Sequence, residues 1–282
     1  MTIRTVTDST ADLPPQLATE LGITVVPVYL RFGDDVYRDR VDISEDEFYQ
    51  RLLRDRVHPN TTQPTPQDFA DAYQKLSSQD TDGIISIHVS GKLSGTYNAA
   101  LQGKELVENR CPIAVIDSKL LSMGLGLLTL AAVTIAKSRR SLQQMVTDVE
   151  QVIPTIRLFI LLDTLKYLVL GGRVGKAQAL LGSVLNVKPV LTVKDGELVP
   201  ASRVRSRAKG IDKLYDFARS AVDIQDLAIV HATTPDEAEA LAEHIVPIFP
   251  RERVKLARVG PALGVHGGPG ALGLAFREKR PV

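Results

Sequence analysis

The stretch GIISIHVSGKLSGTYNAA (83–100) joins an apolar run to a segment with the composition of a helix. The run 83–89 is short and nearly continuous, as is typical of a strand buried on both faces of a parallel sheet. Two serines, two glycines and a threonine lie between this run and the helix. Because a helix N-terminus has unpaired N–H groups and a positive dipole end, the turn is suited to an anion. A phosphate, an oxyanion beside a nucleophilic Ser94 and a ligand carboxylate all fit.

Strand-like runs alternate with helical segments on both sides of this stretch, which predicts a parallel sheet with helices on both faces. Ligands of such sheets bind beyond the carboxyl ends of the strands, where Asp8, Ser90 and Asp117 fall. Pro27 favours an edge position for its strand. Strands are expected at 3–9, 23–32 and 113–118, and a helix is expected from Pro14 and Pro15 to Gly22.

The second half of the chain has a different pattern, in which hairpins accompany strands and helices. The segment KPVLTVKDGELVPASR (188–203) predicts a hairpin, because Asp195-Gly196 is a two-residue turn signal. We therefore expect an α/β chain with an N-terminal parallel-sheet domain at 1–155 and an α+β domain at 156–282. Further helices are expected at 177–187, 209–221 and 235–246, and further strands at 227–233 and 254–260.

Composition excludes several classes of function. Lys and Arg total 34 against 33 Asp and Glu, and Trp is absent, so no basic or stacking surface indicates nucleic-acid binding. Cys111 is the only cysteine, which rules out an intrachain disulfide, and the five histidines are scattered without metal-ligand spacing. Since no charged-then-apolar leader follows Met1, we expect a cytoplasmic protein. Because the histidines and the cysteine form no ligand cluster, we expect no bound metal.

The segment 120–136 is uncharged over 17 residues, which only just reaches the length of a membrane span. Two glycines, two threonines and a serine dilute its hydrophobicity. We expect a buried helix and no transmembrane segment, with Gly124 and Gly126 allowing close packing.

Two segments resemble nucleotide-binding motifs but do not satisfy them. GGRVGKA (171–177) is one residue shorter than a P-loop and has Ala177 where a hydroxyl must reach magnesium. GPGALG (268–273) leaves only nine residues after it, too few for a βαβ unit. Both are interpreted as turn and packing glycines.

Ser94 has two interpretations from the residues alone. As a nucleophile it would make the chain a serine-type acyl hydrolase, with His266 as base and Asp117 or Asp8 orienting the imidazole, although Gly91-Lys92-Leu93-Ser94-Gly95 is not a G-x-S-x-G elbow. As a cap it would only begin the helix. His266 lies in a glycine-rich segment expected to be a loop.

Six segments, in this order, resemble the DegV family, whose members are the fatty-acid-binding proteins of the bacterial fatty acid kinase system. Together they extend over nearly the whole chain. Two departures are Thr62, where the family commonly has Ser, and Gly91-Lys92, where Ser-Ser is commoner. The segments are TDSTADLP (7–14), TTQPT (61–65), SGKLSGTYNAA (90–100), VIDS (115–118), LKYLVLGGRVG (165–175) and GVHGGPGALG (264–273).

The resemblance implies a monomeric, non-catalytic carrier without a cofactor, which binds one long-chain fatty acid such as palmitate or oleate. It implies that the carrier presents the carboxylate to a separate ATP-dependent fatty acid kinase subunit, which forms acyl phosphate for phospholipid synthesis. An acyl-chain-sensing regulator is the other alternative that it leaves open. The residues implied around the carboxylate, at the domain junction, are Thr61 or Thr62, Ser94, Gly95, His266 and Gly267.

The energetics favour the carboxylate among the three anions. Burying about fourteen methylenes at ~0.8 kcal/mol each gives roughly 11 kcal/mol, against ~4–15 kcal/mol for association and ordering. The segments 158–162 and 177–187 are candidate walls for the acyl chain. In the basic run SRVRSRAK (202–209), Arg203 and Arg205 are candidates for docking the kinase, although such runs often only keep a surface hydrated.

Overall fold

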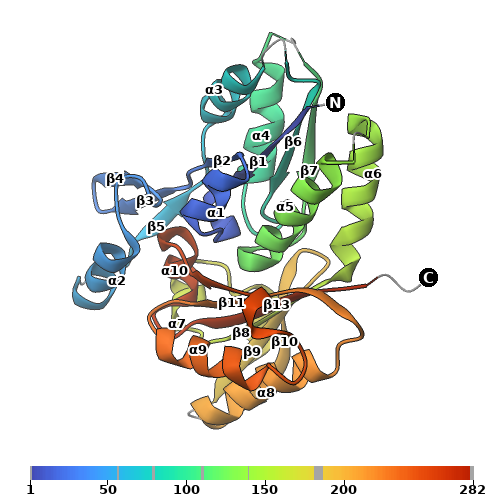
Figure 1. Cartoon of the computed structure of the whole chain (residues 1–282). Helices are drawn as coiled ribbons and strands as arrows, with labels where there is room; N and C mark the ends of the chain where they lie inside the picture. Colours follow the sequence, from blue (N-terminus) through green and yellow to red (C-terminus); the bar gives the residue numbers. More distant parts are fainter. Residues whose placement is uncertain are drawn as a thin grey trace.

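The computed structural model describes residues 2–55, 57–77, 80–108, 111–138, 140–180 and 187–279. It contains a four-stranded parallel sheet, in the order β2-β1-β6-β7, and a six-stranded sheet, in the order β10-β9-β8-β13-β11-β12 (Figure 1). The strands of the first sheet are β1 (Ile3–Asp8), β2 (Ile23–Val26), β6 (Gly83–His88) and β7 (Ile113–Asp117).

Helices cover both faces of the parallel sheet, as the sequence predicts. Helices α3 and α4 pack together on one face, and α5 and α6 pack on the other. Every residue of β6 is buried, which explains the nearly continuous apolar run in the sequence. Cys111 is also buried, in the core on the α3 and α4 side. The helices are α1 (Pro15–Glu20), α3 (Pro66–Leu76), α4 (Thr96–Glu105), α5 (Ser122–Ala136) and α6 (Leu142–Val152).

The single strand expected at 23–32 is wrong. Its first part is β2, at the edge of the parallel sheet, and its second part is β3 (Tyr29–Phe32), in a separate antiparallel sheet of order β4-β3-β5. Pro27 has no N–H for a ladder, and the next amide, Val28 N, donates to Ser9 Oγ at 3.0 Å. The other elements of this excursion are β4 (Asp35–Arg38), α2 (Glu45–Arg54) and β5 (Asn60–Thr62).

The six-stranded sheet is antiparallel except for the β11–β12 pair. The predicted hairpin is confirmed: Asp195 and Gly196 have φ of 51° and 81°, as the expected turn requires. Helices α8 (Arg207–Arg219) and α9 (Pro235–His244) cover its outer face (Figure 1). The strands are β8 (Ile156–Leu161), β9 (Lys188–Lys194), β10 (Glu197–Val204), β11 (Ile224–His231), β12 (Val254–Arg258) and β13 (Leu272–Glu278).

Helix α5 packs against both sheets, contacting β1 and β6 of the first and β8, β11 and β13 of the second. Met123, Leu125, Leu127 and Leu128 are almost completely buried. The buried helix expected at 120–136 is therefore confirmed. Throughout the described ranges, each helix is too short or too polar to cross a membrane.

Two short helices complete the junction between the sheets: α7 (Lys166–Leu170) and α10 (Pro261–Gly267). The expectation of a loop around His266 is wrong, because Pro261 occupies the first turn of α10, where a missing N–H costs nothing. The helix expected at 177–187 lies partly outside the described residues. Residues 177–180 belong to the 3₁₀ helix η3 (Gly175–Leu180), and residue 187 is in no helix.

Candidate ligand-binding site

A cavity lies between the two sheets and encloses about 920 Å³ of space free of protein atoms, part of it open to solvent. Its apolar lining comes from both halves of the chain. Strands of the six-stranded sheet and α10 supply six of these side chains, and the loops and turns around them and α7 supply the others. The apolar side chains are Val28, Val89, Leu93, Leu121, Ile160, Leu162, Leu168, Leu191, Leu198, Val230, Val259, Ala262, Leu263 and Ala271.

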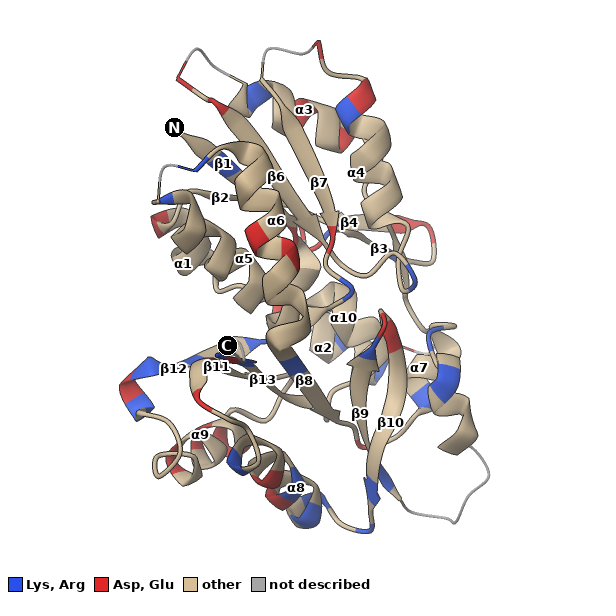
Figure 2. Ribbon diagram, turned by 90° about the vertical axis from the view of Figure 1, so that its right-hand side faces the viewer, with Lys and Arg blue, Asp and Glu red and all other residues tan. Residues whose placement is uncertain are grey.

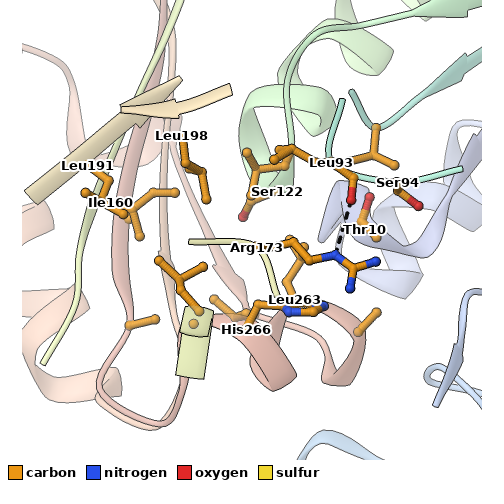
Figure 3. A pocket seen from close by; sticks show the side chains of 18 of the residues that line it. Thr10, Leu93, Ser94, Ser122, Ile160, Arg173, Leu191, Leu198, Leu263 and His266 are labelled. Carbon is orange, nitrogen blue, oxygen red and sulfur yellow. Dashed lines mark hydrogen bonds between the residues drawn. The ribbon is translucent and has the colours of Figure 1, made fainter. Parts of the chain in front are cut away.

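The two ends of the cavity differ in polarity. Ile160, Leu191 and Leu198 lie together at one end, on β8, β9 and β10 (Figure 3). Ser94 and Arg173 lie at the other end (Figure 3). The cavity therefore suits an amphiphile with a long apolar part and a polar head.

His266 and Thr61 meet at the polar end. His266 Nε2 lies 3.0 Å from Thr61 Oγ1, although 205 residues separate the two in sequence. Burial, with a smaller contribution from the positive charge of Arg173, lowers the pKa of His266 to about 3. The imidazole is therefore neutral near pH 7. A Cβ at Gly171 would overlap the ring, so a glycine there lets the α7 turn approach His266.

Arg173 supplies the positive charge at this end of the cavity. Its Nη1 donates to Gly171 O at 2.8 Å and its Nε to Leu93 O at 3.4 Å. No acidic side chain of the described residues forms an ion pair with it. Sequence reasoning missed Arg173, because GGRVGKA was rejected as a P-loop and LKYLVLGGRVG (165–175) was used only for the family resemblance, with no role for its arginine. An arginine flanked by glycines was the available signal.

Of the two adjacent threonines, the structure places Thr61 in the cavity and leaves Thr62 exposed. Successive residues of a strand point to opposite faces, and both lie on β5.

Ser94 lines the cavity at the beginning of α4. Its Oγ lies 2.8 Å from Thr96 Oγ1 and accepts from Thr96 N at 3.3 Å. The hydroxyl thus accepts from the first amide of α4 while lining the cavity, although the N-cap of the helix is Gly95 and not Ser94. Gly95 lies against Gln63 and is not part of the lining, whereas Gly267 is.

Two further hydroxyls line the cavity and were not predicted. Thr10 Oγ1 donates to Asp8, and Ser122 Oγ donates to Asp12 Oδ2 at 2.6 Å. Because a carboxylate can only accept, both hydroxyl protons are already used. They lack the free donor that a bound carboxylate needs.

The hydrolase triad is not assembled. Asp117 accepts from the backbone N–H groups of Gly91 and Lys119, and Asp8 contacts His88 Nδ1 at 3.0 Å. Among the described residues, His266 Nδ1 has no hydrogen-bond partner. No group therefore orients His266 as a base for Ser94.

Arg203 and Arg205 are exposed and do not line the cavity. The hairpin turn at the opposite end of β10 contacts the Ser94 loop, where Ser90 Oγ donates to Gly196 O at 2.7 Å. The six residue-to-residue steps of strand from Glu197 to Arg203 span about 20 Å. The basic end of β10 (Figure 2) is thus remote from Ser94.

The described residues contain no cluster of three or more His, Cys, Asp or Glu side chains that could hold a metal ion.

Comparison with known proteins gives consistent matches over nearly the whole chain. A family model described as "Uncharacterised protein, DegV family" matches residues 2–279. DegV domain-containing proteins of Streptomyces coelicolor and of Caldanaerobacter subterraneus are each 36% identical, over 97% and 98% of this chain and 98% and 99% of their own lengths.

Solved structures agree with these matches. A DegV family protein from Thermus thermophilus, described by its fatty acid binding, has a TM-score of 0.90 at 32% identity, covering 99% of this chain and 100% of its own. DegV of Bacillus subtilis, described as a fatty acid binding protein, has a TM-score of 0.88 at 30% identity with the same coverage. A stearic acid-binding protein from Eubacterium ventriosum has a TM-score of 0.89 at 28% identity, covering 99% of each chain.

Proposed function

Because the chain belongs to the DegV family, we propose that it binds one long-chain fatty acid in the cavity between its two sheets. The carboxylate lies at the end formed by Thr61, Arg173 and His266, with Ser94 beside it. The acyl chain extends over the inner face of the six-stranded sheet toward Leu191 and Leu198.

The observation that carries this proposal is the pairing of an apolar cavity with a guanidinium that has no acidic partner among the described residues. A buried carboxylate without partners costs several kcal/mol, and Arg173 supplies both charge and N–H donors. When the imidazole proton is on Nε2, His266 donates to Thr61 Oγ1, and the Thr61 hydroxyl is then a further, neutral donor for the ligand. A fatty acid satisfies both ends of the cavity at once.

A carrier fits the site better than an acyl hydrolase does, because no described carboxylate orients His266. A serine-reactive fluorophosphonate should accordingly leave Ser94 unlabelled. Stoichiometric labelling of Ser94 in the wild type would support the hydrolase.

We further propose that the bound acid is presented to an ATP-dependent kinase subunit for acyl-phosphate formation. Arg203 and Arg205, exposed at the far end of β10, are the candidate docking residues. Rim charges act mainly on the rate of encounter. Arg205→Ala should therefore slow acyl-phosphate formation at low salt while fatty-acid affinity stays unchanged. An equal rate for variant and wild type at low and high salt would remove this docking role.

The experiment that tests binding compares two ligands that differ only in the head group. Delipidated protein is titrated with palmitate and with hexadecanol. Arg173→Gln should weaken the binding of palmitate by about 1–3 kcal/mol, the usual value of a hydrogen bond to a charged group. The binding of hexadecanol should not change.

Lys176→Gln is the matched control, since Lys176 is a nearby cation whose partner is Glu197 at 2.7 Å, outside the cavity lining. Equal losses for both ligands in Arg173→Gln, or no palmitate binding by the wild type, would contradict the proposal.

A further inference from the structure

The floor of the cavity is one row of residues that lie directly opposite one another across the six-stranded sheet. Leu191 on β9 pairs with Ile160 on β8, Ile160 with Gly273 on β13, and Gly273 with Val230 on β11. All four line the cavity. Residues directly opposite in a ladder point to the same face, so this row faces the ligand as a unit.

The neighbouring row on the same face is covered by protein. It contains Leu158, Ala275 and Ala228, two positions along β8, β13 and β11, and all three are buried beneath α5. A Cβ at Gly124 of α5 would lie 3.6 Å from Leu158 Cβ, which shows how closely the helix rests there. The cavity therefore begins where α5 ends its contact with the sheet.

Gly273 interrupts the row that faces the cavity. It lies inside a central strand, where a glycine weakens the strand and often marks the close approach of a ligand. Ile160 stands on one side of it and Val230 on the other, so at Gly273 the cavity is lined by backbone where its neighbours in the row present side chains. Gly273 lies between Val230 and the apolar end at Leu191, and Val230 Cγ1 leans toward it, 2.8 Å from where a Cβ would lie, so the space above Gly273 is narrow.

We propose that Gly273 is a specificity-determining residue, over which the acyl chain crosses β13, and that its missing side chain admits long chains to the apolar end. The inference rests on the proposed function and adds the path of the chain. Between β11 and β10 lie four inter-strand steps, or roughly 19 Å at ~4.8 Å each. Only a long chain reaches across them, and a short one ends before β13.

Adding a methyl group at Gly273 takes space from the cavity whichever way the site relaxes. The new Cβ would lie 2.8 Å from Val230 Cγ1, so one of the two groups must move. Val230 itself lines the cavity. The space is therefore lost either to the methyl group or to a displaced valine.

The test is a series of saturated fatty acids from octanoate to stearate, titrated into the delipidated wild type and Gly273→Ala. Wild-type affinity should rise with every added methylene. The affinity of Gly273→Ala should equal that of the wild type for octanoate and then stop rising with chain length. For palmitate and stearate it should be lower than the wild-type affinity by about tenfold or more. Gly273→Ala/Val230→Ala should recover most of that loss, because the second change removes the crowding atom.

Gly83→Ala is the control, since Gly83 is also a strand glycine whose Cβ would meet side-chain methyl groups at 3.2 Å, but it lies outside the cavity lining. Its curve should follow the wild type. Parallel curves for Gly273→Ala and the wild type at every length would overturn the role of Gly273 while leaving fatty-acid binding intact. Absence of binding in the wild type would instead overturn the proposed function. Equal weakening of Gly273→Ala at all lengths, octanoate included, would also count against the path over Gly273.

Discussion

At the scale of single residues, the polar end of the cavity is made by side chains that two distant parts of the chain bring together. Thr61 on β5 and His266 on α10 are in contact, while Thr62, one residue away, points to solvent. A hydroxyl beside a neutral imidazole can donate to a carboxylate without forming a rigid ion pair. The alternation of a three-residue strand decides which threonine does so.

This alternation gives a matched pair of variants. Thr61→Val removes the hydroxyl at nearly constant shape, so it should weaken palmitate binding by about 1–3 kcal/mol. Thr62→Val should leave affinity within the error of calorimetric titration, since the side chain is exposed. The reverse order of effects would place Thr62, and not Thr61, at the carboxylate.

At the scale of elements, α5 holds the two sheets together by packing against both. Its two glycines, Gly124 and Gly126, differ in how closely neighbouring atoms approach them. A Cβ at Gly126 would lie 2.7 Å from Ala11 O, whereas at Gly124 the nearest atoms would be at 3.6–3.7 Å, an ordinary contact distance. Gly126 therefore permits a backbone approach that no other residue allows, and Gly124 does not.

Gly126→Ala should accordingly destabilise the protein by about 1–3 kcal/mol, because overpacking forces α5 away from Ala11. Gly124→Ala should be neutral or stabilising by up to about 1 kcal/mol, because alanine favours the helix. Urea unfolding of both variants measures the difference. Equal stabilities would show that the junction is loose enough to absorb a methyl group.

The elements that could be predicted from the sequence are those with local signals. The buried strand at β6, the Asp195-Gly196 turn and the uncharged helix α5 each have a pattern within a dozen or so residues. The β3–β5 pairing and helix α10 were missed, because their stability depends on packing between segments far apart in sequence. Arg173 was missed for the same reason: its role depends on the cavity, which no local pattern describes.

At the scale of the whole molecule, the junction buries two carboxyl groups beside one guanidinium. Asp12 accepts from Ser122 on α5 and from Gly260 N, at 2.6 and 2.8 Å, so it links the two halves. Burial, partly offset by Arg40, raises the pKa of Asp12 to about 6 and that of Asp39 to about 7. The folded protein therefore holds protons that the unfolded chain, titrating near 3.8, has lost.

Stability linked to Asp39 should fall as pH rises between about 4 and about 7, since the folded state binds more protons in that window. Asp39→Asn cannot titrate, so it should be more stable than the wild type at about pH 8, by at most about 4 kcal/mol, and lose most of this gain at about pH 5. Urea unfolding at both pH values measures the difference.

Asp42→Asn is the control. Hydrogen bonds from Arg38 lower the pKa of Asp42 to about 2, so that group is ionised throughout this range. Its difference from the wild type should not change with pH. If the difference between Asp39→Asn and the wild type is also independent of pH, the pKa of Asp39 is not raised into this range.

The most direct test of the account is native mass spectrometry of the protein purified from a bacterial host without added lipid, followed by organic extraction and lipid analysis. The account predicts a mass excess of one long-chain fatty acid per chain, recovered as the free acid, because an apolar cavity of this size favours any amphiphile that fits it. A protein with no mass excess that also fails to bind added palmitate or oleate would contradict it.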